Sequence, residues 1–105
     1  MKFTTLIPLN RNDGSEVSQA EINEILAEIA TRFGGFTSEG TVDGSWLDSG
    51  KIYSDRLLKV SVACDRSQYE EAKQVVIGIG RRTGQLAMFF EVVFFDGVQI
   101  LEIVD

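Results

Sequence analysis

The chain of 105 residues contains no histidine, one cysteine and one proline. Without histidine, neither a Ser-His nor a Cys-His catalytic pair can form. A single cysteine, Cys64, excludes an intramolecular disulfide and a cysteine metal site, and the acidic residues do not follow the spacing of an EF-hand. We therefore expect no cofactor and no metal, and we favour a binding protein over an enzyme.

Basic residues are also scarce. Ten Lys and Arg residues stand against sixteen Asp and Glu residues, which gives a net charge of −6. A nucleic-acid-binding surface must neutralise phosphates, so we expect no nucleic acid partner. The one basic cluster, Arg81-Arg82, lies at a predicted helix end, where positive charge complements the helix dipole.

Long hydrophobic runs are missing as well. No stretch reaches the roughly 18 consecutive apolar residues that a membrane-spanning helix needs. The first residues have neither the long hydrophobic region nor the small-residue cleavage site of a signal peptide. These features predict a chain without membrane association, located in the cytoplasm.

The overall amino-acid composition is that of one globular domain. Hydrophobic residues make up 44% of the chain and charged residues 25%. At this length a single core can bury enough surface to be stable without metals or disulfides.

Two helices are predicted from capping boxes that precede apolar residues at spacings of three and four. The first begins at Ser18, with Glu21 as its partner, and ends at Gly34-Gly35. The second begins at Ser67, with Glu70 as its partner, and weakens over Gly78–Gly84. The glycines of Gly78–Gly84 superficially resemble a phosphate loop, but they follow the predicted helix instead of preceding it, so we interpret them as helix termination.

Alternating apolar residues predict the strands. The predicted extended segments are Lys2–Leu9, a ragged strand within residues 36–46, Ile52-Tyr53 after a turn at Asp48–Lys51, and Leu57–Cys64. Cys64 is in phase with the apolar residues of the last segment and is interpreted as a small core side chain.

The most apolar stretch is Gln85–Asp105, which Asp96-Gly97 divides into two strand-like runs. Asp-Gly is typical of a two-residue hairpin turn with positive φ angles. The resulting register places Glu91 directly opposite Glu102.

The predicted order of elements favours an α+β fold. We expect a ferredoxin-like βαββαβ sandwich with an antiparallel sheet, two helices on one sheet face, and an added C-terminal strand that forms the hairpin. In this arrangement the other face of the sheet remains open.

A helix that ends in FGGFT is followed by Gly44 and Trp46, then Asp55, a Val60-x-Val62 strand and Gly84-Gln85. This pattern resembles small uncharacterised bacterial domains of ferredoxin-like fold, over residues 1–95. The resemblance implies the fold, and it implies no catalytic residues.

Three groups of residues are candidates for a ligand site or an interface. The open sheet face is expected to carry an apolar set, in which Glu91 and Glu102 form a carboxylate pair that could donate a proton or bind a cation. The alternatives for this pair are a different register or a wet edge. The predicted apolar set consists of Phe89, Val93, Phe95 and Ile100. A polar hairpin contributes the third group, which consists of Trp46, Tyr53, Asp55 and Arg56 and resembles a recognition surface; Trp46 could equally cover the core.

Three functions remain open at this point. The first is a non-enzymatic module that forms a homodimer through the open sheet face, because monomers rarely expose a large apolar patch. The second is a small-molecule sensor that binds its ligand at loop Asn10–Glu16. The third is a small dimeric α+β barrel enzyme whose pocket would use Glu91, Glu102, Tyr53 or Arg56.

Overall fold

The computed structural model describes residues 1–95 and 97–104. The elements are β1 (Lys2–Pro8), α1 (Gln19–Phe33), β2 (Thr37–Asp48), β3 (Lys51–Ala63), the short 3-10 turn Arg66–Gln68, α2 (Tyr69–Arg82) and β4 (Phe90–Val93). The predicted βαββαβ order is therefore present. Neither helix has the length and apolarity required to cross a membrane.

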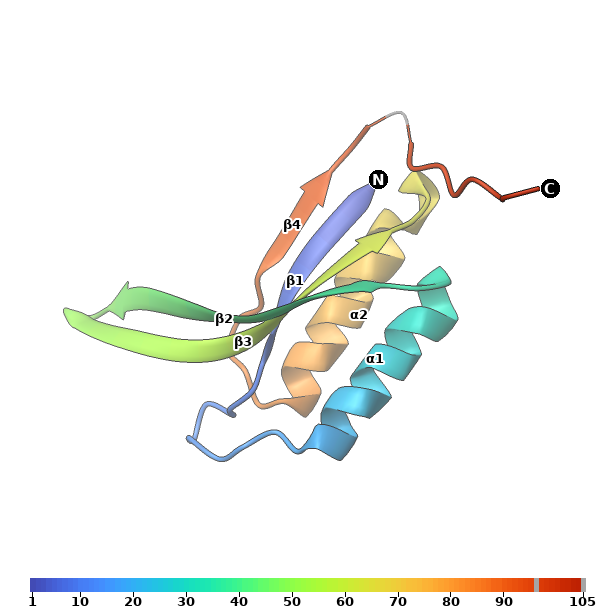
Figure 1. Ribbon diagram of the computed structural model, residues 1–105. Coiled ribbons are helices and arrows are strands. Elements are labelled where there is room, and N and C mark those ends of the chain that lie inside the picture. The colour runs from blue at the N-terminus through green and yellow to red at the C-terminus, as the bar shows by residue number, and fades with distance from the viewer. Residues whose placement is uncertain (96, 105) are drawn as a thin grey trace.

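The four strands form one open antiparallel sheet in the order β2-β3-β1-β4. Figure 1 shows the two helices side by side behind the sheet, with β2 and β3 crossing in front of them. The fold is thus mixed α+β, with β1 in the interior of the sheet and β2 and β4 at its edges.

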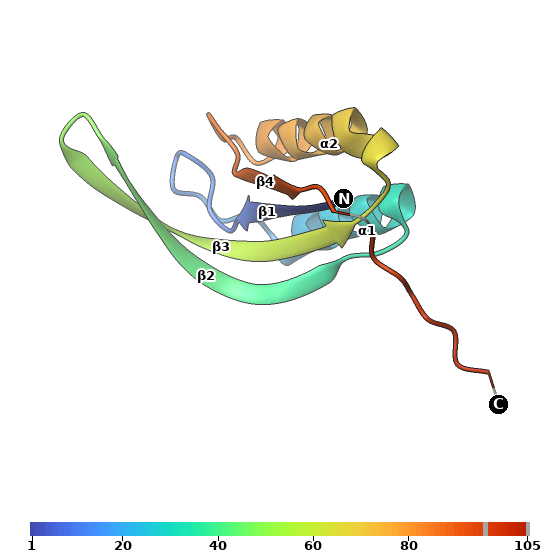
Figure 2. The same cartoon turned by 90° about the horizontal axis from the view of Figure 1, so that it is seen from above.

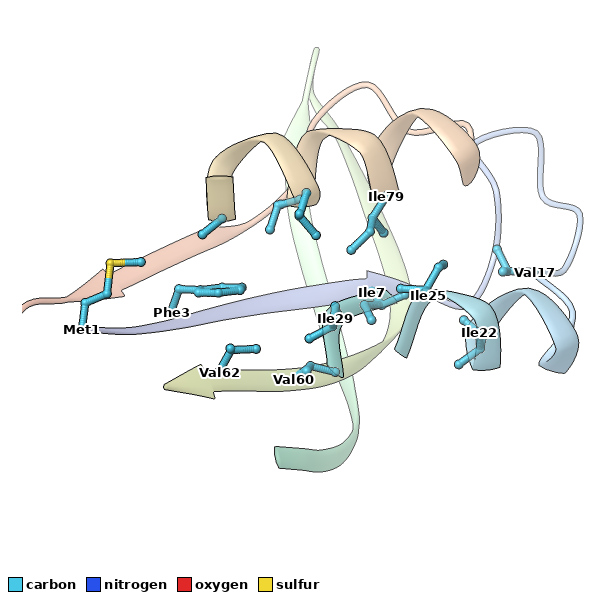
Figure 3. Close-up of a cluster of buried hydrophobic side chains, with 13 residues drawn as sticks. Met1, Phe3, Ile7, Val17, Ile22, Ile25, Ile29, Val60, Val62 and Ile79 are labelled. Carbon is cyan, nitrogen blue, oxygen red and sulfur yellow. The ribbon is translucent and has the colours of Figure 1, made fainter. Parts of the chain in front are cut away.

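A single core lies between the helices and the sheet. Alternate residues of β1, Phe3, Thr5 and Ile7, point into it and are fully buried. Phe3 and Ile7 belong to one cluster with Val60 and Val62 of β3, and Figure 3 shows these four side chains together with those of both helices. The helices contribute Ile22, Ile25 and Ile29 of α1 and Val75, Val76 and Ile79 of α2, and Met1 and Val17 complete the large side chains of the cluster.

Helix α1 begins and ends where the sequence predicts. The Ser18 hydroxyl accepts a hydrogen bond of 3.1 Å from the Glu21 N–H, which satisfies one of the free donors of the first turn. Gly34 adopts a φ of 87° and donates its N–H to the Ala30 carbonyl at 2.9 Å. This left-handed conformation suits glycine and ends the helix.

The start of α2 differs from the prediction. The capping contacts are made by Asp65, whose N–H donates to the Gln68 side-chain oxygen at 3.1 Å, and not by Ser67 and Glu70. A 3-10 turn intervenes, so the α-helix begins at Tyr69. Residues 75–80, which have a strand-like composition, are helical, and Gly78 and Gly80 lie within α2.

The predicted C-terminal hairpin is the main correction to the fold. Strand β4 comprises only four residues, and Val98–Val104 form no strand. The predicted turn residue Asp96 lies outside the described residues. Figure 2 shows the last residues leaving the sheet instead of folding back along β4.

Phe3 is the residue whose removal should cost most. Replacing a fully buried phenylalanine by alanine typically destabilises a domain by about 3–5 kcal/mol. We expect Phe3→Ala to lower the free energy of unfolding by this amount in chemical denaturation. Leu47→Ala, at an exposed position, should change it by less than about 0.5 kcal/mol. Equal effects of the two substitutions would contradict the position of the core.

Candidate interaction surface

Strands β2 and β3 continue beyond the sheet as a two-stranded arm. The distal part, Thr41–Arg56, pairs within the hairpin, apart from a hydrogen bond of 3.1 Å from the Leu9 N–H to the Arg56 carbonyl at its base. In Figures 1 and 2 this part projects past the helices. Ser49 and Gly50 form its tip with φ angles of 51° and 78°. Positive φ at both central residues is the geometry of a type I′ turn, whose twist matches that of paired strands.

The arm brings together the polar-hairpin residues that the sequence indicated. Trp46 and Tyr53 are directly opposed, and their rings stack with centroids 5.6 Å apart. The Lys51 ammonium lies 5.1 Å from the centre of the Tyr53 ring. Trp46 is 46% exposed and Tyr53 is 39% exposed, so this aromatic pair does not cover the core.

A strip of apolar residues joins the aromatic pair to the open face of the sheet. Side chains alternate along a strand, so residues next to core-facing ones point to the open face. By this rule Leu6 and Leu57 lie there, with Val42 opposite Leu57. Tyr53 and Trp46 follow on the same face, four residues further along β3 and β2. We call Leu6, Val42, Trp46, Tyr53 and Leu57 the apolar strip.

Gly44 keeps the strip continuous. A Cβ atom at this position would lie 2.9 Å from Leu57 Cδ1, so the leucine side chain lies over the glycine. Leu57 thereby fills the gap between Val42 and the aromatic pair. Sequence reasoning missed Leu6, Val42 and Leu57, because their position depends on the pairing of strands distant in the chain.

The opposite side of the arm carries an exposed aliphatic pair and a solvated ion pair. Leu47 and Ile52 face each other there and are 69% and 70% exposed. Arg56 forms an ion pair of 3.8 Å with Asp43, and both side chains are largely in solvent. Arg56 and Asp55 are adjacent in β3, so their side chains lie on opposite sides of the arm.

The middle of the open face is polar, which corrects the predicted apolar face. The Thr4 and Ser61 hydroxyls are hydrogen-bonded at 3.1 Å. Beside them Lys59 pairs with Glu39 at 3.2 Å, and the hydrogen bond from Lys59 lowers the pKa of the Glu39 carboxyl.

The predicted apolar set is dispersed. Val93, at the edge of the sheet, and Phe89, just before β4, are about half exposed. Phe95 and Ile100 lie beyond β4, beside the end of β3. These four residues therefore do not form one continuous apolar patch on the open face.

The predicted opposition of Glu91 and Glu102 is wrong. Glu91 pairs with Thr4 of β1, and Glu102 lies in the segment after β4 that forms no strand. The register of β4 is set by its pairing with β1, and the Asp96-Gly97 sequence does not determine it. The residues proposed for a barrel-type pocket, Glu91, Glu102, Tyr53 and Arg56, are therefore separated.

Loop Asn10–Glu16 is closed by its own contacts. Arg11 forms an ion pair with Glu21 and donates to the Glu16 carbonyl at 2.8 Å. The Gln85 side chain donates to the Asn10 carbonyl at 3.0 Å and ties the loop to the end of α2. These contacts hold the loop against the start of α1 and the end of α2.

Two concave regions are present elsewhere. One, of about 400 Å³, lies between α2 and residues 85–90. The other, of about 620 Å³, lies at the end of α1 and is lined by Phe36, Cys64, Phe95 and Ile100. Within residues 1–95 and 97–104, no three Cys, Asp or Glu side chains gather closely enough to hold a metal ion.

Comparison of the chain with protein-family models and with curated proteins finds no match. The assignment of a function therefore depends on the geometry described above.

The Cys64 thiol provides a test of the packing around the larger concave region. Its burial raises the pKa of the thiol, and only the thiolate reacts with alkylating reagents. At a pH near the ordinary thiol pKa, we expect iodoacetamide to modify Cys64 more slowly in the folded protein than in urea. Equal rates, after correction for the effect of urea on a free thiol, would contradict this packing.

Proposed function

We propose that this chain is a non-enzymatic interaction module of ferredoxin-like fold, and that its partner is a second copy of itself bound through the open sheet face. The observation that carries the proposal is the apolar strip, which continues from the sheet onto an arm of only two strands. At its outer end Trp46 and Tyr53 remain exposed to a large extent.

Burial of the exposed apolar side chains of the strip would drive association. Burying a large apolar side chain contributes roughly 1.5–3 kcal/mol. An isolated two-stranded hairpin is at best marginally stable in water, so cover over the aromatic pair would also hold the arm in place. Aromatic residues are moreover enriched at the energetic centres of protein interfaces.

The charges beside the strip favour a second copy as the partner. Asp48, Lys51 and Asp55 lie on the same face of the arm as the aromatic pair, so this surface carries both signs. A two-fold axis brings each surface against itself, which allows Lys51 of one copy to meet an aspartate of the other. The acidic net charge also disfavours a polyanionic partner.

The sheet supports the ferredoxin-like assignment. The βαββαβ order is the one characteristic of that fold, and β1 pairs with both β3 and β4 while β2 lies outermost. Kinship with small bacterial domains of this fold, which the sequence resembles, forms part of the same proposal.

Sedimentation velocity over a concentration series tests the proposal with a matched pair of variants. We expect the wild-type chain to form dimers and Trp46→Lys to shift it to monomers, because a charge would be buried in the interface. Leu47→Lys changes the adjacent, more exposed residue on the other side of the arm and should leave the dimer intact. Circular dichroism checks that both variants are folded.

Two results would contradict the proposal. One is a folded wild-type chain that sediments as a monomer at every concentration. The other is a dimer that Trp46→Lys and Leu47→Lys weaken to the same extent.

A further inference from the structure

We propose that the C-terminal segment, Gly97–Val104, of one copy adds as a strand to the free edge of β4 in a second copy. Its side chains would enter the groove between α2 and residues 85–90, here called the α2 groove. This inference uses a surface other than the apolar strip, and it rests on the proposed function in two respects: the partner is a second copy, and that copy lies on the side of the open sheet face.

The α2 groove is apolar with a basic rim. Val76 and Ile77 of α2 line one side, and Met88 and Phe90 line the other. Lys73 and Arg81 lie at the same groove, one helical turn before and after the apolar pair. A ligand that fits this lining is apolar along its length and carries a negative charge.

Gly80 allows the groove to have this shape. A Cβ atom there would lie 2.7 Å from Met88 Cγ, so Met88 approaches the backbone of α2 directly. Ile77, one turn earlier, remains 41% exposed on the groove wall. The groove thus has a closed floor at Met88 and an uncovered apolar wall.

Strand β4 provides backbone partners beside the groove. It is an edge strand that pairs with β1 along one side, and the described part of the chain supplies no strand along the other. Unpaired N–H and C=O groups at a sheet edge are a template for another extended chain. Strand addition of this kind combines backbone hydrogen bonds with pockets that take alternate side chains.

The C-terminal segment has the composition that the groove requires. Its five aliphatic side chains are between 50% and 90% exposed, and Glu102 supplies a negative charge. Eight residues at about 3.3 Å each span roughly 26 Å when extended, which is enough to run along β4 and the residues before it. The aliphatic residues are Val98, Ile100, Leu101, Ile103 and Val104.

The position of the segment indicates exchange between copies. Val98 and Ile100 lie at the concave region beside Phe36 and Cys64, at the end of β3, and thus away from the free edge of β4. In Figure 2 the segment then leaves the domain on the side of the sheet opposite α2. A second copy bound on the open face lies on that side.

Disulfide trapping between single-cysteine chains tests the inference. All chains carry Cys64→Ser. One chain carries Ile77→Cys in the α2 groove, and its partner carries either Ile100→Cys or Leu101→Cys. Because neighbouring residues of a strand point to opposite sides, we expect one of the two tail cysteines to form a mixed disulfide under mild oxidation and the other to form little.

Leu47→Cys in place of Ile77→Cys supplies the control for random collision, since Leu47 is exposed but distant from the groove. If neither tail cysteine gives a higher yield of mixed disulfide with Ile77→Cys than with this control, the inference is overturned. A chain that carries Ile77→Cys and the reactive tail cysteine together could instead form the disulfide within itself at high dilution. This result would also overturn the inference, since the segment would then occupy its own groove.

The two proposals fail in different ways. If the wild-type chain forms dimers that Trp46→Lys dissociates, but no mixed disulfide exceeds the control, strand exchange is wrong and the strip interface stands. If the mixed disulfide forms and Trp46→Lys leaves the association unchanged, strand exchange is supported and the strip interface is wrong.

Discussion

The structure depends on the packing of Phe3 in the interior strand of the sheet. Its ring meets Phe33 edge-on at 5.3 Å and stacks on Phe90 at 5.6 Å. Phe33 is the last residue of α1, and Phe90 is the first residue of β4. The buried ring of Phe3 in β1 therefore contacts both the end of α1 and the start of β4. Tyr69, at the start of α2, packs on Phe90 and brings the second helix to the same cluster.

This arrangement determines which parts of the chain lack cover. The helices extend over β1 and the adjoining parts of β3 and β4, because the apolar core residues are there. The distal part of the β2–β3 hairpin has no helix against it and is stabilised within the chain by its turn and by cross-strand pairs such as Trp46 and Tyr53. Among the residues after β4, those that the structure describes, 94–95 and 97–104, likewise contribute nothing to the buried core. Both proposals concern these two uncovered segments.

The sequence predicts best the features that depend on neighbouring residues. Helix α1 follows from Ser18, its apolar spacing and Gly34, and the turn at Asp48–Lys51 follows from local turn chemistry. The start of α2 is less predictable, because Asp65 with Gln68 satisfies the same spacing as Ser67 with Glu70. Both pairs offer a short side-chain acceptor three residues before a Gln or Glu.

Features that depend on distant residues could not be predicted in this way. The pairing of β4 with β1 decides that Glu91 lies beside Thr4, and no local pattern encodes this pairing. The apolar strip combines residues of three strands, and the adjacent Leu57 and Leu58 conceal the alternation that would reveal it. Val98–Val104 have the composition of a strand, yet they lack a pairing partner within the described chain.

Hydrogen exchange measured at several protein concentrations tests most directly the claim that a second copy covers the open face. If it does, backbone amides of Thr41–Arg56 exchange more slowly as the concentration rises through the range of association, while those of the exposed loop Asn10–Glu16 keep their rates. Exchange of the arm that is independent of concentration, in a chain that stays folded throughout, would contradict the account.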